Sequence, residues 1–219
     1  MSNDEILKAL YDETMVGNAP AVLELTKKGL DEGLTPSELL FDALIPSLEE
    51  VGARFERGDW FVPEMLIAGR AMAGALEVLR PLLAQTGAET VGTFLMGTVK
   101  GDVHDIGKNL VNIMLEGAGF HVIDIGVQAA PEKFIAGIEE HNPDIVGMSA
   151  FLTTTMPMFK ANINAIEKSG LRDKVIIMVG GAPVTQEYAD VCGADGYAAD
   201  AATAVRRAKE LIAAKRGAA

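Results

Sequence analysis

The first 87 residues carry apolar side chains three or four positions apart, the spacing that places them on one face of a helix. Thr35-Pro36-Ser37-Glu38 combines an N-cap threonine, a proline and a glutamate at the capping-box position, which predicts a helix start. Short links separate the helical segments and favour an antiparallel four-helix bundle. The predicted helices span residues 4–16, 21–29, 35–55 and 62–83.

From residue 90 the pattern changes to short apolar runs that alternate with helical segments. Apolar strands of this kind are typical of a parallel sheet buried on both faces. We therefore predict an α/β protein: a helical domain over 1–87, then a flavodoxin-like (Rossmann-like) five-stranded parallel sheet domain over 88–219. The predicted strands span residues 91–99, 120–126, 144–149, 175–179 and 196–198, and the helices 108–117, 131–141, 155–169, 185–191 and 201–215.

The turn after the first predicted strand holds a carboxylate and an imidazole, Asp102 and His104. Parallel sheets bind ligands at the carboxyl ends of their strands, where this turn lies. A histidine there can offer one ring nitrogen to a metal while a nearby carboxylate holds the other N–H and fixes the tautomer. The simpler alternative is a surface histidine in a βα turn, with Asp105 as a helix N-cap.

Two later strands end in segments suited to a ligand. Four hydroxyl side chains lie within Ser149–Thr155 and could hydrogen-bond a buried polar group, although Thr154 or Thr155 is also expected to cap the next helix. Gly180 and Gly181 allow the backbone to pass close to a flat or bulky group, or form a simple turn. Because the carboxyl ends of parallel strands share one edge, these segments are expected to converge on the His104 turn.

Composition narrows the function. The formal net charge of −12 over 219 residues argues against non-specific binding to nucleic acid or to anionic membranes. The acidic N-terminus lacks the pattern of a signal peptide, and the single cysteine, Cys192, permits no intramolecular disulfide. These features favour a cytoplasmic location. Three histidines and one cysteine cannot form a Cys/His zinc cluster, so a metal would have to arrive largely coordinated.

The segment from Gly97 to Asn109 resembles the cobalamin-binding signature Asp-x-His-x-x-Gly, filled here by Asp102, His104 and Gly107. In that family the histidine displaces the dimethylbenzimidazole of the cofactor and becomes the lower axial ligand of cobalt. The resemblance therefore implies His104 as the metal ligand and Asp102 as its partner. The other residues that it implies at the cofactor are Val103, Asp105, Ile106 and Gly107.

The later segments extend this resemblance. The Ser-x-Leu element of the family falls on Ser149 and Phe151, with phenylalanine in place of leucine and Leu152 directly after it. By resemblance, Ser149 and Thr153 contact the displaced benzimidazole. The Gly-Gly element falls on Gly180 and Gly181, which by resemblance line the tunnel for the nucleotide tail.

The helical half adds a second match. Residues 51–65 resemble the cap module of cobalamin-dependent methionine synthase and of methyltransferase corrinoid proteins. Phe55 and Val62 fall at the two cap positions that face the methyl group, although the family more often has leucine at the second. Trp60 would add to this apolar lid. The alternative for these residues is an ordinary place in the bundle core.

Together the two matches imply a corrinoid methyl carrier that is not catalytic alone. The cap would have to move aside to expose the methyl group, which predicts a hinge at 84–90. Cobalamin would bind base-off with His104 on cobalt, methylcobalamin being the working form, and Asp102 would take up or release a proton as His104 leaves or joins the metal. A substrate-specific methyltransferase would load the methyl group from methanol, a methylamine, a betaine or an aryl methyl ether. A second methyltransferase would pass it to tetrahydrofolate or coenzyme M, and a reductive activase would serve the system.

Three alternatives have the same α/β pattern. The small subunit of an adenosylcobalamin mutase would share the Asp-x-His-x-x-Gly element but would need no methyl-shielding cap. A cobalamin-dependent light sensor or regulator would usually add a helix-turn-helix and a basic patch. A flavodoxin-like domain without a corrin would leave His104, Ser149 and the Gly180-Gly181 pair without a common purpose.

Overall fold

The computed structural model describes residues 1–86 and 90–217. The chain divides into two compact units. Unit 1 comprises Met1–Thr90 with Glu116–Gly119, and unit 2 comprises Val91–Leu115 with Phe120–Ala219. The predicted boundary between residues 87 and 88, and residues 87–89 of the predicted hinge, lie outside the described residues.

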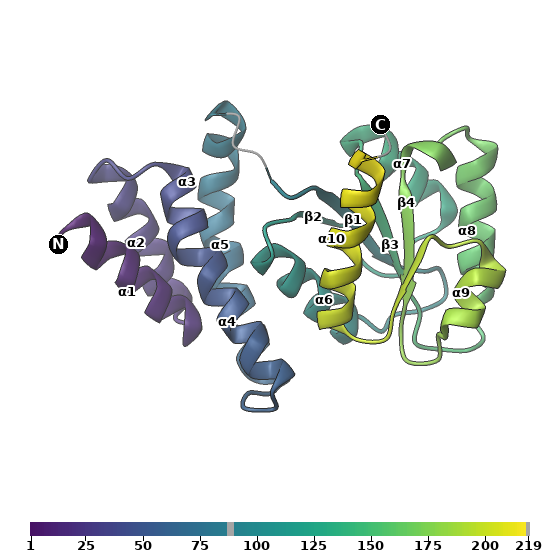
Figure 1. Cartoon of the computed structure of the whole chain (residues 1–219), viewed down its shortest axis with the longest axis horizontal. Coiled ribbons are helices and arrows are strands. Elements are labelled where there is room, and N and C mark those ends of the chain that lie inside the picture. The colour runs from purple at the N-terminus through teal and green to yellow at the C-terminus, as the bar shows by residue number, and fades with distance from the viewer. Residues whose placement is uncertain (87–89, 218–219) are drawn as a thin grey trace. The chain divides into compact units, whose positions relative to one another are not determined.

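Unit 1 is built from helices packed side by side, with strands absent from its described residues (Figure 1). The Thr35 N-cap is confirmed, since its hydroxyl accepts the Glu38 N–H at 3.1 Å while the Glu38 carboxylate accepts the Thr35 N–H at 2.7 Å. The helices are α1 (Asn3–Met15), α2 (Ala19–Asp31), α3 (Pro36–Glu38), the π-helical η1 (Leu39–Leu44), α4 (Ile45–Glu56) and α5 (Val62–Thr86). Their apolar faces form a core that includes Ile6, Leu10, Val22, Leu39, Leu44, Met65, Met72 and Leu79.

The third predicted helix is continuous but is not α-helical throughout. Between α3 and α4 the backbone widens into the π-helical turn η1, and the N–H of Ile45 donates to the carbonyl of Leu40, five residues earlier. Pro46 explains the widening, because it has no N–H and its ring would collide with the carbonyl four residues before it in a regular α-helix. The expectation of an uninterrupted α-helix over 35–55 is therefore wrong at this turn.

Unit 2 is a five-stranded parallel sheet with strand order β2-β1-β3-β4-β5, the flavodoxin-like order. Every predicted strand is present, with bounds within two residues of the prediction. The strands are β1 (Thr93–Thr98), β2 (His121–Asp124), β3 (Ile145–Ser149), β4 (Ile176–Gly180) and β5 (Gly196–Ala198). The helices are α6 (Ile106–Gly117), α7 (Pro131–His141), α8 (Pro157–Lys168), the 3-10 turn η2 (Arg172–Lys174), α9 (Gln186–Cys192) and α10 (Ala201–Gly217).

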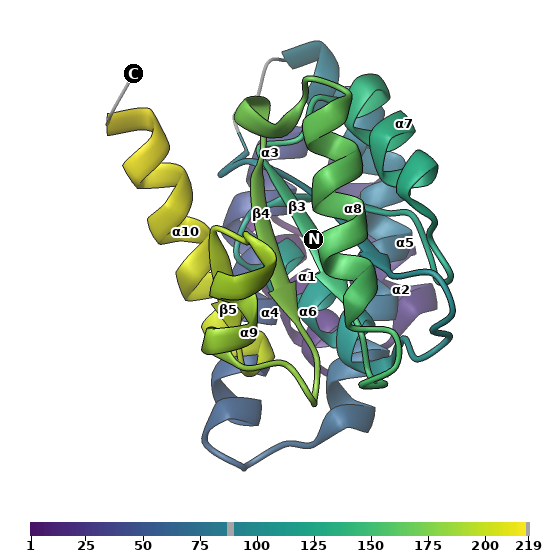
Figure 2. The same ribbon diagram turned by 90° about the vertical axis from the view of Figure 1, so that its right-hand side faces the viewer.

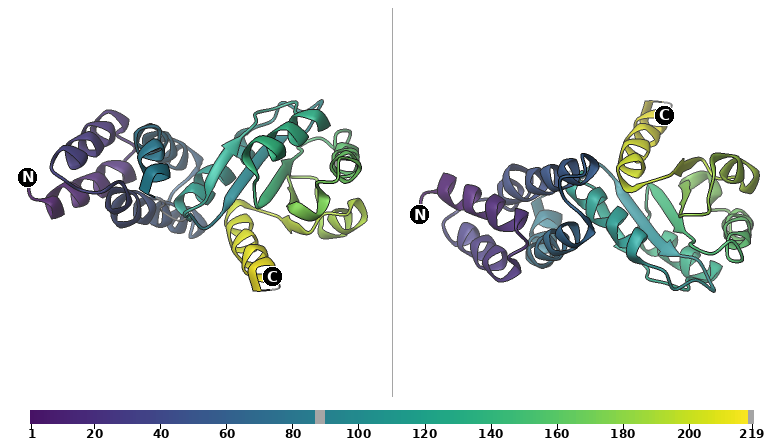
Figure 3. Two further views of the ribbon diagram at one scale, coloured as in Figure 1. Left: turned by 90° about the horizontal axis from the view of Figure 1, so that it is seen from above. Right: turned by 90° about the horizontal axis from the view of Figure 1, so that it is seen from below.

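Helices cover both faces of this sheet, as its apolar strands require. Figure 2 shows α10 on one side of the sheet and α7 with α8 on the other, and Figure 3 shows the same layers from above and below. On the side of α7 and α8 the core includes Leu95, Phe134, Val146, Phe159 and Ile177, all fully buried. Within residues 1–86 and 90–217, none of the helices is long and apolar enough to cross a membrane.

The start of α8 corrects one expectation. Neither Thr154 nor Thr155 caps this helix: the N-cap position is Met156, and its side chain makes no capping hydrogen bond. Pro157 occupies the first helical position, which proline favours, so the cap falls one residue after the threonines. Thr155 is buried instead, and its hydroxyl has another partner in the site described next.

Candidate cofactor-binding site

Three strand ends meet at the carboxyl edge of the sheet in unit 2. Thr98 of β1 is in register with Ser149 of β3, which is in register with Gly180 of β4. The N–H of Ala150 donates to the carbonyl of Gly180 at 3.2 Å and extends this pairing beyond the strands. The segments singled out in the sequence after β1, β3 and β4 are thus neighbours in space.

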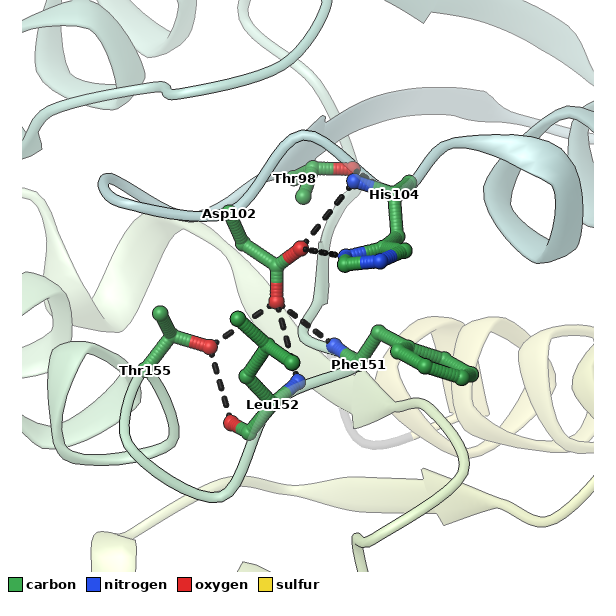
Figure 4. Close-up of polar contacts among 6 residues, drawn as sticks. All are labelled: Thr98, Asp102, His104, Phe151, Leu152 and Thr155. Atoms are coloured by element: carbon green, nitrogen blue, oxygen red, sulfur yellow. Dashed lines mark hydrogen bonds and ion pairs between the residues drawn. The ribbon is translucent and has the colours of Figure 1, made fainter.

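Asp102 is the polar centre of this edge. Its side chain is fully buried and receives five hydrogen bonds, all of them from the loops after β1 and β3 (Figure 4). Oδ1 accepts the backbone N–H of His104 at 3.0 Å and pairs with His104 Nδ1 at 2.7 Å. Oδ2 accepts the N–H groups of Phe151 at 2.7 Å and Leu152 at 3.1 Å, and the hydroxyl of Thr155 at 2.9 Å.

These donors decide the charge of Asp102. Burial alone would raise the pKa of a carboxyl group, but the hydrogen bonds from the backbone and ring of His104 and from the N–H groups of Phe151 and Leu152 lower it by more. The pKa of Asp102 therefore lies well below its ordinary value, and the side chain is an anion that only accepts hydrogen bonds.

The charge of Asp102 also fixes the state of His104. Since an ionised carboxylate has no hydrogen to give, His104 Nδ1 must carry the hydrogen of their 2.7 Å bond. In the neutral imidazole Nε2 then holds the lone pair, which is the form that binds a metal. The His104 side chain is 46% exposed, and the centroid of its ring lies 4.5 Å from that of Phe151 at an interplanar angle of 31°. In this tautomer Nε2, on a partly exposed side chain, is the nitrogen able to bind a metal.

Exposed apolar side chains within two residues of His104 and in the loop after β3 form what we call the apolar rim. Val103, Ile106, Phe151 and Leu152 are all exposed, Ile106 to 65%, although large apolar side chains of this kind usually lie inside a protein. A Cβ built on Gly107 would meet no atom within 4 Å, so the space over the start of α6 is open. A metal-binding nitrogen beside exposed apolar side chains is suited to a largely apolar ligand that carries a metal.

The two glycines after β4 differ from each other. Gly181 has φ of +129°, and a Cβ there would lie 1.9 Å from the carbonyl oxygen of Ala150, so the fold itself requires glycine at this position. A Cβ on Gly180 would meet only the carbonyl oxygen of Ala198, at 3.2 Å. Gly180 is therefore the residue of the pair whose lack of a side chain leaves room for a bound group.

The remaining predicted site residues occupy varied places. Ser149 is half-buried at the end of β3, and Thr153 is exposed in the following loop. Asp105 is half-buried, and its carbonyl accepts the N–H of Asn109 at 2.7 Å. The contacts predicted for these side chains with a cofactor stay predictions.

The two predicted cap residues belong to unit 1. Phe55 lies near the end of α4 and Val62 begins α5, both half-buried, on either side of a turn in which Gly58 has φ of +77°. In that turn the guanidinium of Arg54 lies 4.9 Å from the centre of the Trp60 ring. Their role toward the cofactor stays a prediction.

Sequence reasoning assigned one residue of the site wrongly and missed another. Thr155, expected as a helix cap, is instead a donor to Asp102, and Thr98 holds the ligand loop by donating its hydroxyl to the carbonyl of His104 at 3.1 Å. The signal for Thr155 was Pro157, which marks the first helical position and so excludes Thr155 from the cap. Thr98 gave no signal beyond a hydroxyl at the end of an apolar strand.

Comparisons with known proteins agree with this geometry. Residues 92–206 match the family described as "B12 binding domain", and residues 6–80 match a second family of the same description. The chain is 44% identical over 214 residues to the dimethylamine corrinoid protein of Methanosarcina barkeri, covering 97% of this chain and 100% of that protein. It is 38% identical over 212 residues to a corrinoid protein of Desulfitobacterium hafniense, covering 95% and 96%.

Solved structures give the same result. A chain in the crystal structure of the methanol:cobalamin methyltransferase complex from Methanosarcina barkeri superposes with a TM-score of 0.83 at 29% identity, over 96% of this chain and 80% of that one. A cobalamin-binding protein from Desulfitobacterium hafniense gives a TM-score of 0.67 at 28% identity, over 96% and 98%. The alternative of a flavodoxin-like domain without a corrin is wrong in view of these matches. The chain belongs to the B12-binding corrinoid proteins of methyl transfer, and cobalamin is its cofactor.

Proposed function

We propose that this protein carries a methyl group on cobalamin, which it binds base-off with His104 as the lower axial ligand of cobalt. The observation that carries the proposal is the bond between His104 Nδ1 and the buried Asp102 anion, which leaves Nε2 of a partly exposed side chain as the metal-binding nitrogen, with the apolar rim nearby. Cobalamin, when bound, supplies a cobalt centre that accepts and releases a methyl group.

The chain itself would bind, orient and shield. Asp102 holds the Nδ1–H of His104, which fixes the tautomer and raises the basicity of the ring, and Phe151, Leu152 and Thr155 hold Asp102 in turn. Ser149 and Thr153 would contact the displaced base, and Gly180 with Gly181 would line the path of the nucleotide tail. Phe55 and Val62 would keep water from the methyl-bearing face.

The relatives narrow the proposed partners. The Methanosarcina barkeri relative is named for dimethylamine, which favours a methylamine as the methyl donor and a methylamine methyltransferase as the loading partner. A related chain occurs in a methanol:cobalamin methyltransferase complex, which supports a direct complex with such an enzyme. A second methyltransferase that acts on tetrahydrofolate or coenzyme M, and a reductive activase, complete the proposed system. Full-length relatives of this kind favour a carrier over a mutase subunit or a regulator.

The first test is the absorption spectrum of the protein after incubation with hydroxocobalamin and desalting. Wild type is expected to retain the cofactor with a nitrogen ligand from the protein, and His104→Ala is expected to lose it or to show a changed spectrum. His141→Ala is the matched control, since His141 lies in the last turn of α7 and is also partly exposed. Spectra of His104→Ala and wild type that coincide at saturation would rule out His104 as the ligand.

The donor is tested separately. Reconstitution with a dimethylamine methyltransferase and coenzyme M is expected to give methyl transfer that depends on this protein and on dimethylamine. Transfer from methanol alone would keep the carrier role and replace the donor.

A further inference from the structure

A buried lysine lies next to the site without being part of it. Lys108 is in the first turn of α6, and its side chain is only 2% exposed, which is rare for lysine unless the charge is paired. Its ammonium group forms an ion pair with Asp124, the last residue of β2, and donates to Asn109 Oδ1 at 2.7 Å. This pair therefore joins the start of α6 to the carboxyl end of the neighbouring strand.

Asp124 gathers further donors. Its Oδ2 also accepts the side-chain N–H of Asn112, one turn along α6, at 3.0 Å. Its Oδ1 accepts the backbone N–H of Gly126 at 2.7 Å. One carboxylate thus fixes two successive turns of α6 and the beginning of the segment 125–129.

The segment 125–129 in turn holds the loop that carries the ligand. The carbonyl of Gly126 accepts the N–H of Thr98 at 2.9 Å, and the N–H of Gln128 donates to the carbonyl of Asp102 at 3.1 Å. Gly126 has φ of +80° and Gln128 has φ of +51°, a left-handed conformation that costs energy for glutamine and needs support from its surroundings. The conformation of this segment is therefore tied to the bonds that it makes.

Both ends of the ligand loop are attached to this network. At its start, Thr98 donates its hydroxyl to the carbonyl of His104 at 3.1 Å and its N–H to Gly126. At its end, α6 begins at Ile106, two residues after His104, and is tied to Asp124 through Lys108. A shift of Asp124 would thus be transmitted to His104 from two directions.

We propose that Lys108 and Asp124 are positioning residues that hold the loop 99–105 in the conformation in which His104 can ligate cobalt. The inference deepens the proposed function, because it takes His104 to be the ligand. The competing explanation is that the pair only docks α6 against β2. The two differ in what they predict for the loop and the cofactor in protein that remains folded.

The central variants are Lys108→Met, which removes the charge and keeps the length of the side chain, and Asp124→Asn, which keeps an acceptor for Gly126. The matched control is Arg172→Met at the amino edge of the same sheet. There the Arg172 guanidinium pairs with Asp195 at 2.7 Å, and Asp195 accepts the N–H of Ile177 at 2.7 Å. The control removes a cation from a carboxylate that also holds a backbone N–H, far along the strands from the ligand loop.

Two readouts separate the explanations. In cofactor-free protein, amide hydrogen exchange of His104 and Gln128 is expected to be about 10-fold faster in Lys108→Met and Asp124→Asn than in wild type or Arg172→Met. In loaded protein, both variants are expected to bind hydroxocobalamin about 10- to 100-fold more weakly, the loss typical of groups that orient a metal ligand. At saturation they should show a smaller share of the nitrogen-ligated spectrum.

The double variant tests whether the two residues act as one. Lys108→Met/Asp124→Asn is expected to bind cobalamin no more weakly than the worse single variant. Should Lys108→Met fail to fold, Asp124→Asn alone decides, since its side chain is partly exposed and remains an acceptor. The proposal would be overturned if the variants are less stable but, while folded, show the same hydrogen exchange, the same affinity for cobalamin and the same spectrum as wild type. If His104→Ala and wild type have the same spectrum, the proposed function fails, and the exchange rates still decide whether the pair holds the loop.

Discussion

At both edges of the sheet in unit 2, a carboxylate joins two segments by accepting backbone N–H groups, but the surroundings of the carboxylate differ. At the amino edge, Asp144 accepts the N–H of Thr93 at 2.8 Å and Asp195 accepts that of Ile177 at 2.7 Å. Each carboxylate thus ties the beginning of one strand to the residue that precedes the neighbouring strand of the sheet. At the carboxyl edge, Asp102 ties the loop after β1 to the loop after β3 by the same kind of bond.

The edges differ in what surrounds the carboxylate. Asp195 pairs with the guanidinium of Arg172. Asp102 pairs instead with an imidazole side chain that is 46% exposed, and the loops around it carry apolar, exposed side chains. The comparison teaches that a carboxylate accepting backbone N–H groups belongs to the architecture of this sheet at both edges, whereas the partly exposed imidazole and the apolar rim distinguish the carboxyl edge. The following predictions test that division, from the largest expected effect to the smallest.

Gly181→Ala should have the largest effect, because the fold rather than the cofactor requires this glycine. The new Cβ would lie 1.9 Å from the Ala150 carbonyl oxygen at a φ of +129°. Overpacking and backbone strain together predict a loss of about 3 to 5 kcal/mol in the free energy of unfolding, measured by urea denaturation. Gly180→Ala is the control and should lose about 1 kcal/mol or less. Equal losses at both positions would contradict the assignment of Gly181 to the fold.

Asp102→Asn should rank second and should affect both stability and binding. Donors that now reach an anion would face a neutral amide with one acceptor, at a cost of about 2 to 3 kcal/mol in the cofactor-free protein. Cobalamin should bind about 10- to 100-fold more weakly. If the variant is destabilised but binds cobalamin with unchanged affinity, Asp102 has only the structural role of the carboxylates at the amino edge.

The effect of Asp102→Asn should also depend on pH. A carboxyl group with a lowered pKa stabilises the fold above its ordinary pKa of about 4 and loses that contribution as the pH falls through its own lower value. The difference in unfolding free energy between wild type and Asp102→Asn should therefore be largest at neutral pH and should shrink below about pH 4. A difference that stays constant on acidification would mean that the charge of Asp102 contributes nothing to folding.

Asp195→Asn should separate the two edges most clearly. Loss of the ion pair with Arg172 and a weaker acceptor for Ile177 predict a cost of about 1 to 2 kcal/mol in unfolding free energy. Affinity for hydroxocobalamin should stay at the wild-type value. A matching loss of affinity would show that the amino edge also controls the site.

Gly107→Ala should have the smallest effect on stability, in the favourable direction. Alanine in α6 is preferred over glycine by up to about 1 kcal/mol, and its Cβ would meet no atom within 4 Å. The methyl group would instead occupy the open space beside His104, so cobalamin affinity should fall while the melting temperature rises. Undiminished binding would show that the cofactor does not approach this part of the helix.

The architecture could be predicted from the sequence, because the elements show the hydrophobic spacing of a helix or a strand and many are bounded by glycine or proline. The predicted bounds of α7 and β5 agree with the structure, since Pro131 marks one helix start and Gly196 begins a short apolar run. The π-helical turn was not predicted, because a proline inside a helical pattern does not reveal whether the helix ends, kinks or widens.

The candidate site was only partly predictable. Spacing placed Asp102, His104, Ser149 and Gly180 at one edge, because parallel strands end together. The contacts of Thr155 and Lys108 were not accessible, because they join residues 53 and 16 positions apart through side chains whose burial no local pattern reveals. A lysine between a glycine and an asparagine is usually a surface residue, and only the tertiary fold buries it.

The widened turn at Leu39–Leu44 also determines in which direction the side chains of the following helix, α4, point. A turn closed by bonds between residues five apart holds one residue more than a turn of α-helix, as if a single residue had been inserted there. Each residue of an α-helix rotates the following side chains by about 100°. Rewinding this turn as a regular α-helix, with no residue removed, would rotate all later side chains by about 100° and turn Phe55 to another side of α4. The aim of that side chain is therefore set eleven positions earlier, by a local irregularity in the winding of the helix.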